Sequence, residues 1–374
     1  MANSYLTRTY GSAGNQRIFT ISFWFKRSNL ATGHFFTYQD AASDIRSDFS
    51  IVNDRIGINF NPTGSSWGAD LTIQENGTNI LFRDTSAWYH IVMAFDTTQS
   101  TEANRLKVYV NGDQKTMSGY PSQDFDTGYN TAIEHSVGTY IHSPGGNYFD
   151  GYMSHFAVVD GQQLAPTVFG ETDSTSGIWK FKSPSGVTWG TNGFHLKFEN
   201  SGALGTDSSG NSNTFTVNGN LKQALDTPSN VHATMNSLVP STNITFSNGS
   251  NTITGSQADN YSQSTISTLG VSAGKWYCEA KYTTANANVN PNVGIATLEN
   301  FRYDVNNTGA SGFANVRFDG QVYVDGTSGS SSYWGSNPVA GDIIMFALDM
   351  DNGKFYLGKN GTWENSGVPT SGST

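Results

Sequence analysis

The sequence lacks several features that mark common functional classes. It has one cysteine, Cys278, so no disulfide can form within the chain, and its stability has to come from sheet packing and subunit contacts. Only 13% of its residues are charged, against about 25% in a typical globular chain, so hydroxyl and amide groups supply most of the polar surface. No basic cluster occurs and the formal net charge is -10, which argues against nucleic acid as a partner because phosphate binding needs clustered lysine and arginine.

Long apolar segments are missing as well. Nowhere do about 18 apolar residues follow one another, and the first residues show no charged segment followed by an apolar one. We therefore expect neither a membrane span nor a signal peptide, and synthesis in a host cytoplasm is compatible with both absences.

Glycine and aromatic residues are abundant instead. The chain has 41 glycines among 374 residues and is 13% aromatic, a composition that favours strands and turns over helices. Phe19, Ile21, Phe23 and Phe25 alternate with other residues at the period of two that is typical of a strand. Composition and period therefore predict an all-β protein, and the length suggests two or more domains.

Three strand patterns in the first part of the chain carry a family resemblance. A strand at 88–95 precedes one at 106–110, where Asn111-Gly112 predicts a type I′ hairpin turn, and a Phe-Asp-Gly strand follows at 149–151. This pattern resembles the laminin-G and concanavalin A-like lectin family over residues 1–171. The resemblance implies a jelly-roll β-sandwich with loops that bind ligands.

The last part of the chain resembles SPRY domains over residues 241–374. Its segment 341–363 is similar to their core hairpin, with a Lys359-Asn360-Gly361 turn followed by Trp363. SPRY domains usually continue with further strands after this hairpin. We therefore expect either that the gene product continues beyond Thr374 or that another segment or subunit completes the sheet, because an open edge strand risks aggregation.

Residues 172–240 form a turn-rich bridge between these two parts. The bridge contains too many aromatic residues for a solvated linker, so we expect it to pack against the sandwiches, with short strands at 194–198 and 214–217. The predicted architecture is thus two jelly-roll-like antiparallel β-sandwiches joined by a packed bridge. The order of motifs across 149–235 also resembles a module of bacteriophage virion proteins, especially marine ones, which implies a place on the surface of a phage particle.

Candidate ligand contacts are aromatic and amide side chains in predicted loops, because sugars are held by aromatic faces and polar groups at the ends of sandwiches. In a β-sandwich, core or rim packing is the more common role of such a residue. SPRY loops more often bind peptides, so a protein receptor is an alternative to a glycan. The candidates are Trp67, Tyr120, Tyr129, Asn130, Tyr140 and Asn147 in the first sandwich and Asn300, Tyr303, Tyr333 and Trp334 in the second.

One segment of the bridge suggests a metal site. Alternate oxygen atoms from Asp207, Ser209, Asn211 and Asn213 could ligate Ca²⁺, which prefers hard oxygen ligands. The favoured interpretation is an Asx-type turn, in which these side chains bond the backbone, since no glutamate closes the segment as a bidentate ligand.

Two common motifs of catalysis are absent from the sequence. It contains no His-Glu-x-x-His helix and no phosphate-binding Gly-Lys-Ser/Thr loop. The Glu-x-Asp-x-Glu strand of glycosidases with a concanavalin-like fold is missing too. We therefore expect no enzymatic activity, and a glycan depolymerase is the least favoured hypothesis.

The leading hypothesis is a tail fibre or appendage that touches a host-surface glycan or protein and contacts other virion proteins. Several copies would multiply weak contacts by avidity, and a homo-oligomer, most plausibly a trimer, is expected because stability has to be shared between subunits. A capsid decoration protein without a receptor role is the first alternative. A secreted bacterial adhesin is the second, and the missing export signal disfavours it.

Overall fold

The computed structural model describes residues 3–40, 44–63, 70–140, 147–239, 244–255, 264–284, 291–297, 312–325, 327–329 and 332–372. Strands dominate these residues, which confirms the predicted all-β class. The only helical elements among them are α1 (Glu102–Arg105), η1 (Pro166–Val168) and η2 (Glu364–Ser366). No helix in the described part of the chain is long and apolar enough to cross a membrane.

The chain divides into two compact units. The first contains residues 1–237 and 247–251, and the second contains residues 238–246 and 252–374. Residues 172–237, which make up nearly all of the predicted bridge, therefore lie in the same unit as the first sandwich. A short hairpin is formed by β17 (Ile244–Ser247) and β18 (Thr252–Gly255).

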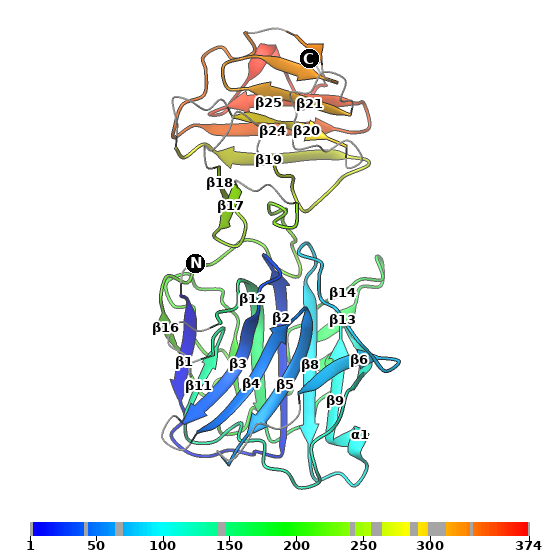
Figure 1. Ribbon diagram of the computed structural model, residues 1–374, viewed down its shortest axis with the longest axis vertical. Coiled ribbons are helices and arrows are strands. Elements are labelled where there is room, and N and C mark those ends of the chain that lie inside the picture. The colour runs from blue at the N-terminus through cyan, green and yellow to red at the C-terminus, as the bar shows by residue number, and fades with distance from the viewer. Residues whose placement is uncertain are drawn as a thin grey trace. The chain divides into compact units, whose positions relative to one another are not determined.

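The first unit is a sandwich of two antiparallel layers (Figure 1). Layer A has the hydrogen-bonded order β15-β12-β2-β8-β9-β10, and layer B has the order β6-β5-β4-β3-β11-β1-β16, with β10 and β6 joined at one edge. The strands of layer A are β2 (Ile18–Arg27), β8 (Tyr89–Asp96), β9 (Leu106–Val110), β10 (Asp113–Met117), β12 (Gly151–Asp160) and β15 (Phe194–Leu196). The strands of layer B are β1 (Tyr5–Thr9), β3 (Gly33–Asp40), β4 (Ile45–Val52), β5 (Arg55–Asn61), β6 (Leu71–Glu75), β11 (Glu134–Val137) and β16 (Thr216–Asn218). Outside the two layers lie β7 (Thr78–Asn79), which pairs with β6, and the hairpin of β13 (Gly170–Thr172) and β14 (Trp179–Phe181).

Several local predictions are confirmed in this unit. The apolar row Phe19, Ile21, Phe23 and Phe25 of β2 lies in the core between the layers. The β9–β10 hairpin turns at Asn111 and Gly112, whose φ angles of 50° and 86° are the positive values that a type I′ turn requires. The two short strands expected in the bridge are β15 and β16, each of which pairs with a sandwich strand.

The bridge covers the outward face of layer A. Trp24 and His90 are stacked with ring centroids 4.5 Å apart, and the indole N–H of Trp179 in the bridge donates to Nδ1 of His90 at 2.9 Å. Nearby, the Lys26 ammonium pairs with the Asp226 carboxylate at 2.8 Å. Both faces of β2 are consequently buried, and nine of its ten residues are inaccessible to solvent.

The second unit is a smaller pair of antiparallel sheets. One sheet has the order β19-β24-β25-β26, with β19 (Lys275–Lys281), β24 (Ile343–Asp349), β25 (Lys354–Lys359) and β26 (Thr362–Trp363). The other has the order β20-β21-β22-β23, with β20 (Asn292–Ala296), β21 (Phe313–Arg317), β22 (Val322–Val324) and β23 (Thr327–Ser328). Its core consists of Val316, Phe318, Trp334, Ile344 and Leu357 with their partly buried neighbours.

Candidate functional site

The outward face of layer B carries a cluster of polar side chains, which we call the polar face. On β4, Phe49 and Ile51 lie in the core, so the alternation of a strand places Arg46 and Asp48 on the opposite side. On β5, Asn59 lies directly across from Asp48 and therefore shares this side. These strands are central in layer B, so the polar side chains sit on a rigid support.

His34 reaches the polar face because of an irregularity in β3. The register between β3 and β4 shifts between His34 and Phe36, and both Phe35 and Phe36 lie in the core. A bulge of this kind re-aims the side chains next to it. His34 is consequently on the side of Asp48, and its Nε2 lies 2.9 Å from Asp48 Oδ1.

The other ring nitrogen of His34 holds a loop. Nδ1 lies 2.9 Å from the backbone oxygen of Asn147. Both ring nitrogens of His34 therefore lie close to an oxygen atom of a neighbouring residue. Because the His34 ring is almost fully buried, it fixes the loop residue Asn147 next to the carboxylate of Asp48.

Tyr140 lies over the same histidine. Its ring centroid is 5.0 Å from that of His34 and the two planes are 22° apart, so the rings are stacked. The preceding residue is anchored, because the oxygen of Thr139 accepts hydrogen bonds from the hydroxyls of Thr37 and Ser136, both at 3.0 Å. Burial raises the pKa of the Tyr140 phenol, so the hydroxyl stays neutral and can donate or accept.

A second carboxyl group extends the polar face across β5. Asp70 is hydrogen-bonded to Asn59, and its pKa is raised by burial and by the charge of Asp48. A Cβ atom on Gly57 would lie 3.7 Å from Asp70 Oδ1 and 3.3 Å from the Thr72 side chain, so glycine leaves room for these groups. The side chain of Asp48 remains 24% exposed, which leaves it accessible to a ligand.

Aromatic, carboxylate and amide groups are thus brought together at the polar face. This set matches what a sugar needs, namely a ring surface and several acceptors and donors for hydroxyl groups. Among the predicted contact residues, the structure brings together Tyr140 and Asn147. Sequence analysis did not single out His34, Arg46, Asp48, Asn59 and Asp70. The signal for Arg46 and Asp48 was their alternation with Phe49 and Ile51.

The remaining predicted contacts of the first sandwich lie elsewhere. Tyr129 is buried, and its hydroxyl donates to the oxygen of Phe36 and accepts from Ser47. Asn130 is buried and donates to the oxygen of Asn15. Tyr120 is partly buried against the same core, and Trp67 lies outside the described residues. Tyr129 and Asn130 therefore have the contacts of core residues.

In the second unit, Trp334 belongs to the core and its indole N–H donates to the oxygen of Arg317 at 2.9 Å. Tyr333 packs against it in an edge-to-face arrangement with ring centroids 5.3 Å apart. Asn300 and Tyr303 lie outside the described residues.

The segment proposed for calcium is held by hydrogen bonds within the chain. The Asp207 carboxylate accepts from the backbone N–H groups of Ser209, His195 and Asn213 at 2.8 to 2.9 Å and from the Ser209 hydroxyl. The side-chain amide of Asn211 donates to two backbone oxygens, and the side-chain oxygen of Asn213 accepts from Arg8. These are the contacts of the favoured Asx-type turn. No group of three or more His, Cys, Asp or Glu side chains in the described ranges could hold a metal ion, and calcium binding remains a prediction.

A serine and a histidine also meet beneath the bridge. Ser22 Oγ lies 2.9 Å from Nε2 of His90, a distance suited to a nucleophile and its base. However, Nδ1 of His90 accepts from Trp179, so the ring proton is on Nε2 and points at Ser22. Burial lowers the pKa of His90 to about 3, and both residues are inaccessible. This pair is therefore a packing contact, because His90 cannot take a proton from the hydroxyl.

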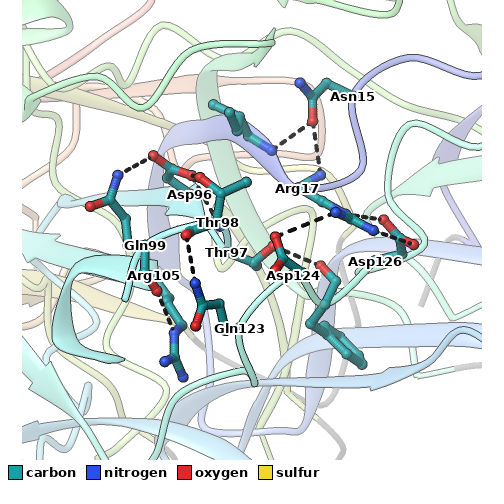
Figure 2. A network of polar contacts seen from close by, with 12 residues as sticks. Asn15, Arg17, Asp96, Thr97, Thr98, Gln99, Arg105, Gln123, Asp124 and Asp126 are labelled. Atoms are coloured by element: carbon teal, nitrogen blue, oxygen red, sulfur yellow. Dashed lines mark hydrogen bonds and ion pairs between the residues drawn. The ribbon is translucent and has the colours of Figure 1, made fainter. Parts of the chain in front are cut away.

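Figure 2 shows a polar network formed by the loops at one end of the sandwich. The Arg17 guanidinium donates to both oxygens of Asp126, at 2.7 and 3.3 Å. Arg105 donates to the backbone oxygens of Gln99, Ser100 and Pro121. The network fastens these loops to one another, and its charged groups are already engaged within the chain.

Comparison with known proteins defines the first sandwich. Its fold is a sandwich of two facing antiparallel layers. The family described as the concanavalin A-like lectin/glucanases superfamily, of laminin-G type, matches residues 2–168, so this part of the chain is a concanavalin A-like lectin/laminin G domain. No curated protein matches the chain.

Solved structures share low identity with the chain. A heptameric SAP-like pentraxin from Limulus polyphemus is 16% identical with a TM-score of 0.32, over 50% of this chain and 82% of its own. Domains LG4-5 of the mouse laminin α1 chain are 10% identical with a TM-score of 0.36, over 100% of this chain and 77% of theirs. The CBM40 of a Ruminococcus gnavus sialidase, bound to α2,3 sialyllactose, is 14% identical with a TM-score of 0.28, over 39% of this chain and 86% of its own. These scores are below 0.5, so the assignment of the first sandwich rests on the family match.

Proposed function

We propose that this protein is a non-enzymatic structural component on the outside of a phage particle, a tail fibre or appendage that binds a host-surface glycan through the polar face. The lectin family match of residues 2–168 supports the binding role. The virion assignment and the SPRY-like character of the second unit rest on the sequence motifs. Other virion proteins and a host-surface receptor are the partners that this function requires.

The observation that carries the binding role is the arrangement around His34. The buried imidazole joins Asp48 on β4 to the ring of Tyr140 and the backbone of Asn147, which are about 100 residues further along the chain. Holding these groups in place before the ligand arrives reduces the entropy lost on binding. A glycan with vicinal hydroxyl groups fits this set. Asp48 can accept hydrogen bonds from hydroxyl groups, and the side-chain amide of Asn147 can both donate and accept them.

Glycan binding is tested with the purified chain on an array of bacterial surface polysaccharides. Tyr140→Ala is expected to weaken binding by roughly tenfold or more, because a stacked aromatic contact contributes on the order of 1 to 2 kcal/mol. Tyr140→Phe keeps the ring and is expected to retain most of the affinity, so it serves as the matched control. Equal affinity of Tyr140→Ala and the native chain would contradict the proposed site.

The virion assignment has a separate test. Gold-labelled antibody against the chain is applied to intact particles of the phage that encodes it. Label at the tail or its appendages is expected. Label over the head shell would favour a decoration protein, and absence of label from particles would favour a cellular adhesin.

A further inference from the structure

Strand β19 of the second unit is exposed along its whole length. All seven of its residues are exposed to solvent, including Trp276 and Tyr277, which keep 51% and 55% of their surface. One edge of β19 pairs with β24, and no strand in the described part of the chain pairs with the other edge. A free edge with aromatic residues is a template for another strand.

The backbone groups at the free edge can be identified from the hydrogen bonds at the two ends of β19. Gly274 accepts from Met350, and Tyr282 both donates to Asp342 and accepts from Gly341, so these even-numbered residues point their backbone groups toward β24. The pairing with β24 has no register shift, and the direction of backbone groups alternates along a strand. The N–H and C=O groups of the odd-numbered residues, which are Lys275, Tyr277, Glu279 and Lys281, therefore point outward.

The core of the second unit stops short of β19. Trp276 and Cys278 lie opposite Leu348 and Phe346 on β24 and share the face of those side chains. Phe346 packs against the core, whereas Trp276 and Cys278 are exposed. On the other face, Tyr277 packs edge-to-face against Trp363 with ring centroids 6.1 Å apart.

The charges of β19 complement those of a second β19 in one antiparallel register. When Tyr277 lies on the two-fold axis, Lys275 of each copy is directly opposite Glu279 of the other. Tyr277 then faces its own counterpart, and cross-strand aromatic and opposite-charge pairs both stabilise a sheet. With Cys278 on the axis Lys275 would face Lys281, and with Glu279 on the axis the two carboxylates would meet. Only the Tyr277 register combines charge pairing with five paired residues.

We propose that β19 pairs antiparallel with β19 of a second copy, with Tyr277 at the two-fold axis. The contact makes one continuous sheet from two second units and places the exposed Trp276 of each copy across from Cys278 of the other. An isologous contact of this kind closes on itself, so it limits further strand addition at this edge. The proposal does not depend on glycan binding.

The first test is the oligomeric state of the full chain by sedimentation equilibrium. The native chain is expected to dimerise, and Glu279→Pro is expected to raise the dissociation constant at least about tenfold, because it removes an outward N–H from each copy. The intrachain sheet should persist, since the N–H of Glu279 does not point at β24. An unchanged circular dichroism spectrum of Glu279→Pro checks this.

Charge reversals give a test that leaves the backbone intact. Glu279→Lys puts a lysine opposite Lys275 of the partner and is expected to weaken dimerisation. Lys281→Glu is the matched control, because Lys281 faces Ala273 in this register and dimerisation should not change. A tighter dimer from Lys281→Glu would overturn the register in favour of the one with Cys278 on the axis.

Disulfide trapping tests the register directly. Trp276→Cys places a thiol opposite Cys278 of the partner in a non-hydrogen-bonded pair, where Cα atoms lie about 4.5 Å apart and a disulfide can form. Mild oxidation should therefore link this variant into dimers and leave the native chain unlinked.

A native chain that stays monomeric at roughly 100 μM, where a contact of micromolar affinity would be saturated, overturns the proposal. A dimer that Glu279→Pro and Glu279→Lys both leave intact overturns it as well.

Discussion

Strands β2 and β19 share a pattern of alternating residues in the sequence but differ in their burial in the structure. In both strands every second residue is apolar, yet nine of ten residues of β2 are buried while all seven of β19 are exposed. In the first unit, the bridge supplies Trp179 and Asp226 to cover the outward face of β2. No described segment does this for β19. Alternation thus identifies a strand, but what lies over its second face depends on residues far away in the chain.

Among the substitutions, the largest difference is expected between two tryptophans. Trp24→Ala should destabilise the first unit by about 4 kcal/mol, because it empties a buried site against His90. Trp276→Ala should change the free energy of unfolding of the second unit by less than about 0.5 kcal/mol, since the ring is half exposed. Scanning calorimetry of both variants measures this. Similar losses of unfolding free energy for the two variants would mean that the face of β19 that carries Trp276 is buried in solution.

The buried ion pair between Lys26 and Asp226 should come next. Asp226→Ala removes the carboxylate to which the Lys26 ammonium and the Trp88 indole N–H both donate, so we expect a loss of about 3 kcal/mol. The double variant Lys26→Met with Asp226→Leu should recover part of this loss because no buried charge remains. Equal Tm values for Asp226→Ala and the native chain would show that the bridge does not hold this face.

Acid should destabilise the first unit selectively. Burial lowers the pKa of His90 and His155 to about 3 and that of His195 to about 4, so these rings are neutral in the folded state. In the unfolded chain these histidines bind protons below about pH 6.5, whereas in the folded chain they stay neutral. The stability of the first unit is therefore full above that pH and decreases as the pH falls toward 4. Each group contributes up to about 1.4 kcal/mol per pH unit.

The second unit is an internal control for this effect, because all seven histidines lie between residues 34 and 232. Urea unfolding between pH 7 and pH 5 should show a falling stability for the first unit and a nearly constant one for the second. Parallel loss in both units would contradict the assignment of the effect to the histidines beneath the bridge.

The smallest effect is expected for the ion pair on β19. Lys275 lies 2.9 Å from Asp349, but its side chain is 60% exposed, whereas that of Lys26 is fully buried. Lys275→Ala should therefore cost less than about 1 kcal/mol when unfolding is measured at low protein concentration. A loss as large as that of Asp226→Ala would contradict the contrast between the two strands.

Local sequence features predicted much of the fold. The period of two in β2 and the Asn111-Gly112 turn depend on neighbouring residues, and both are confirmed. The aromatic content of the bridge correctly indicated packing, and its short strands were placed within a few residues. Motif order also identified the lectin-like sandwich before any comparison.

The candidate site could be predicted only in part. Tyr140 and Asn147 were chosen as loop residues of suitable chemistry, and the structure brings them together through His34. His34 itself could not be found, because a register shift in β3 determines which way it points and its partner Asn147 is 113 residues away. Tyr129 and Asn130 have equally suitable chemistry but lie inside the sandwich. Residue type alone therefore did not separate surface contacts from core residues.

The measurement that tests the central claim most directly is the affinity of the native chain, Tyr140→Ala and Tyr140→Phe for the same array of bacterial surface polysaccharides. We predict binding by the native chain, a loss of roughly tenfold or more for Tyr140→Ala and near-native affinity for Tyr140→Phe, with all three chains folded at the temperature of the assay. Binding that Tyr140→Ala leaves unchanged would contradict the claim that the polar face of the first unit holds the ligand.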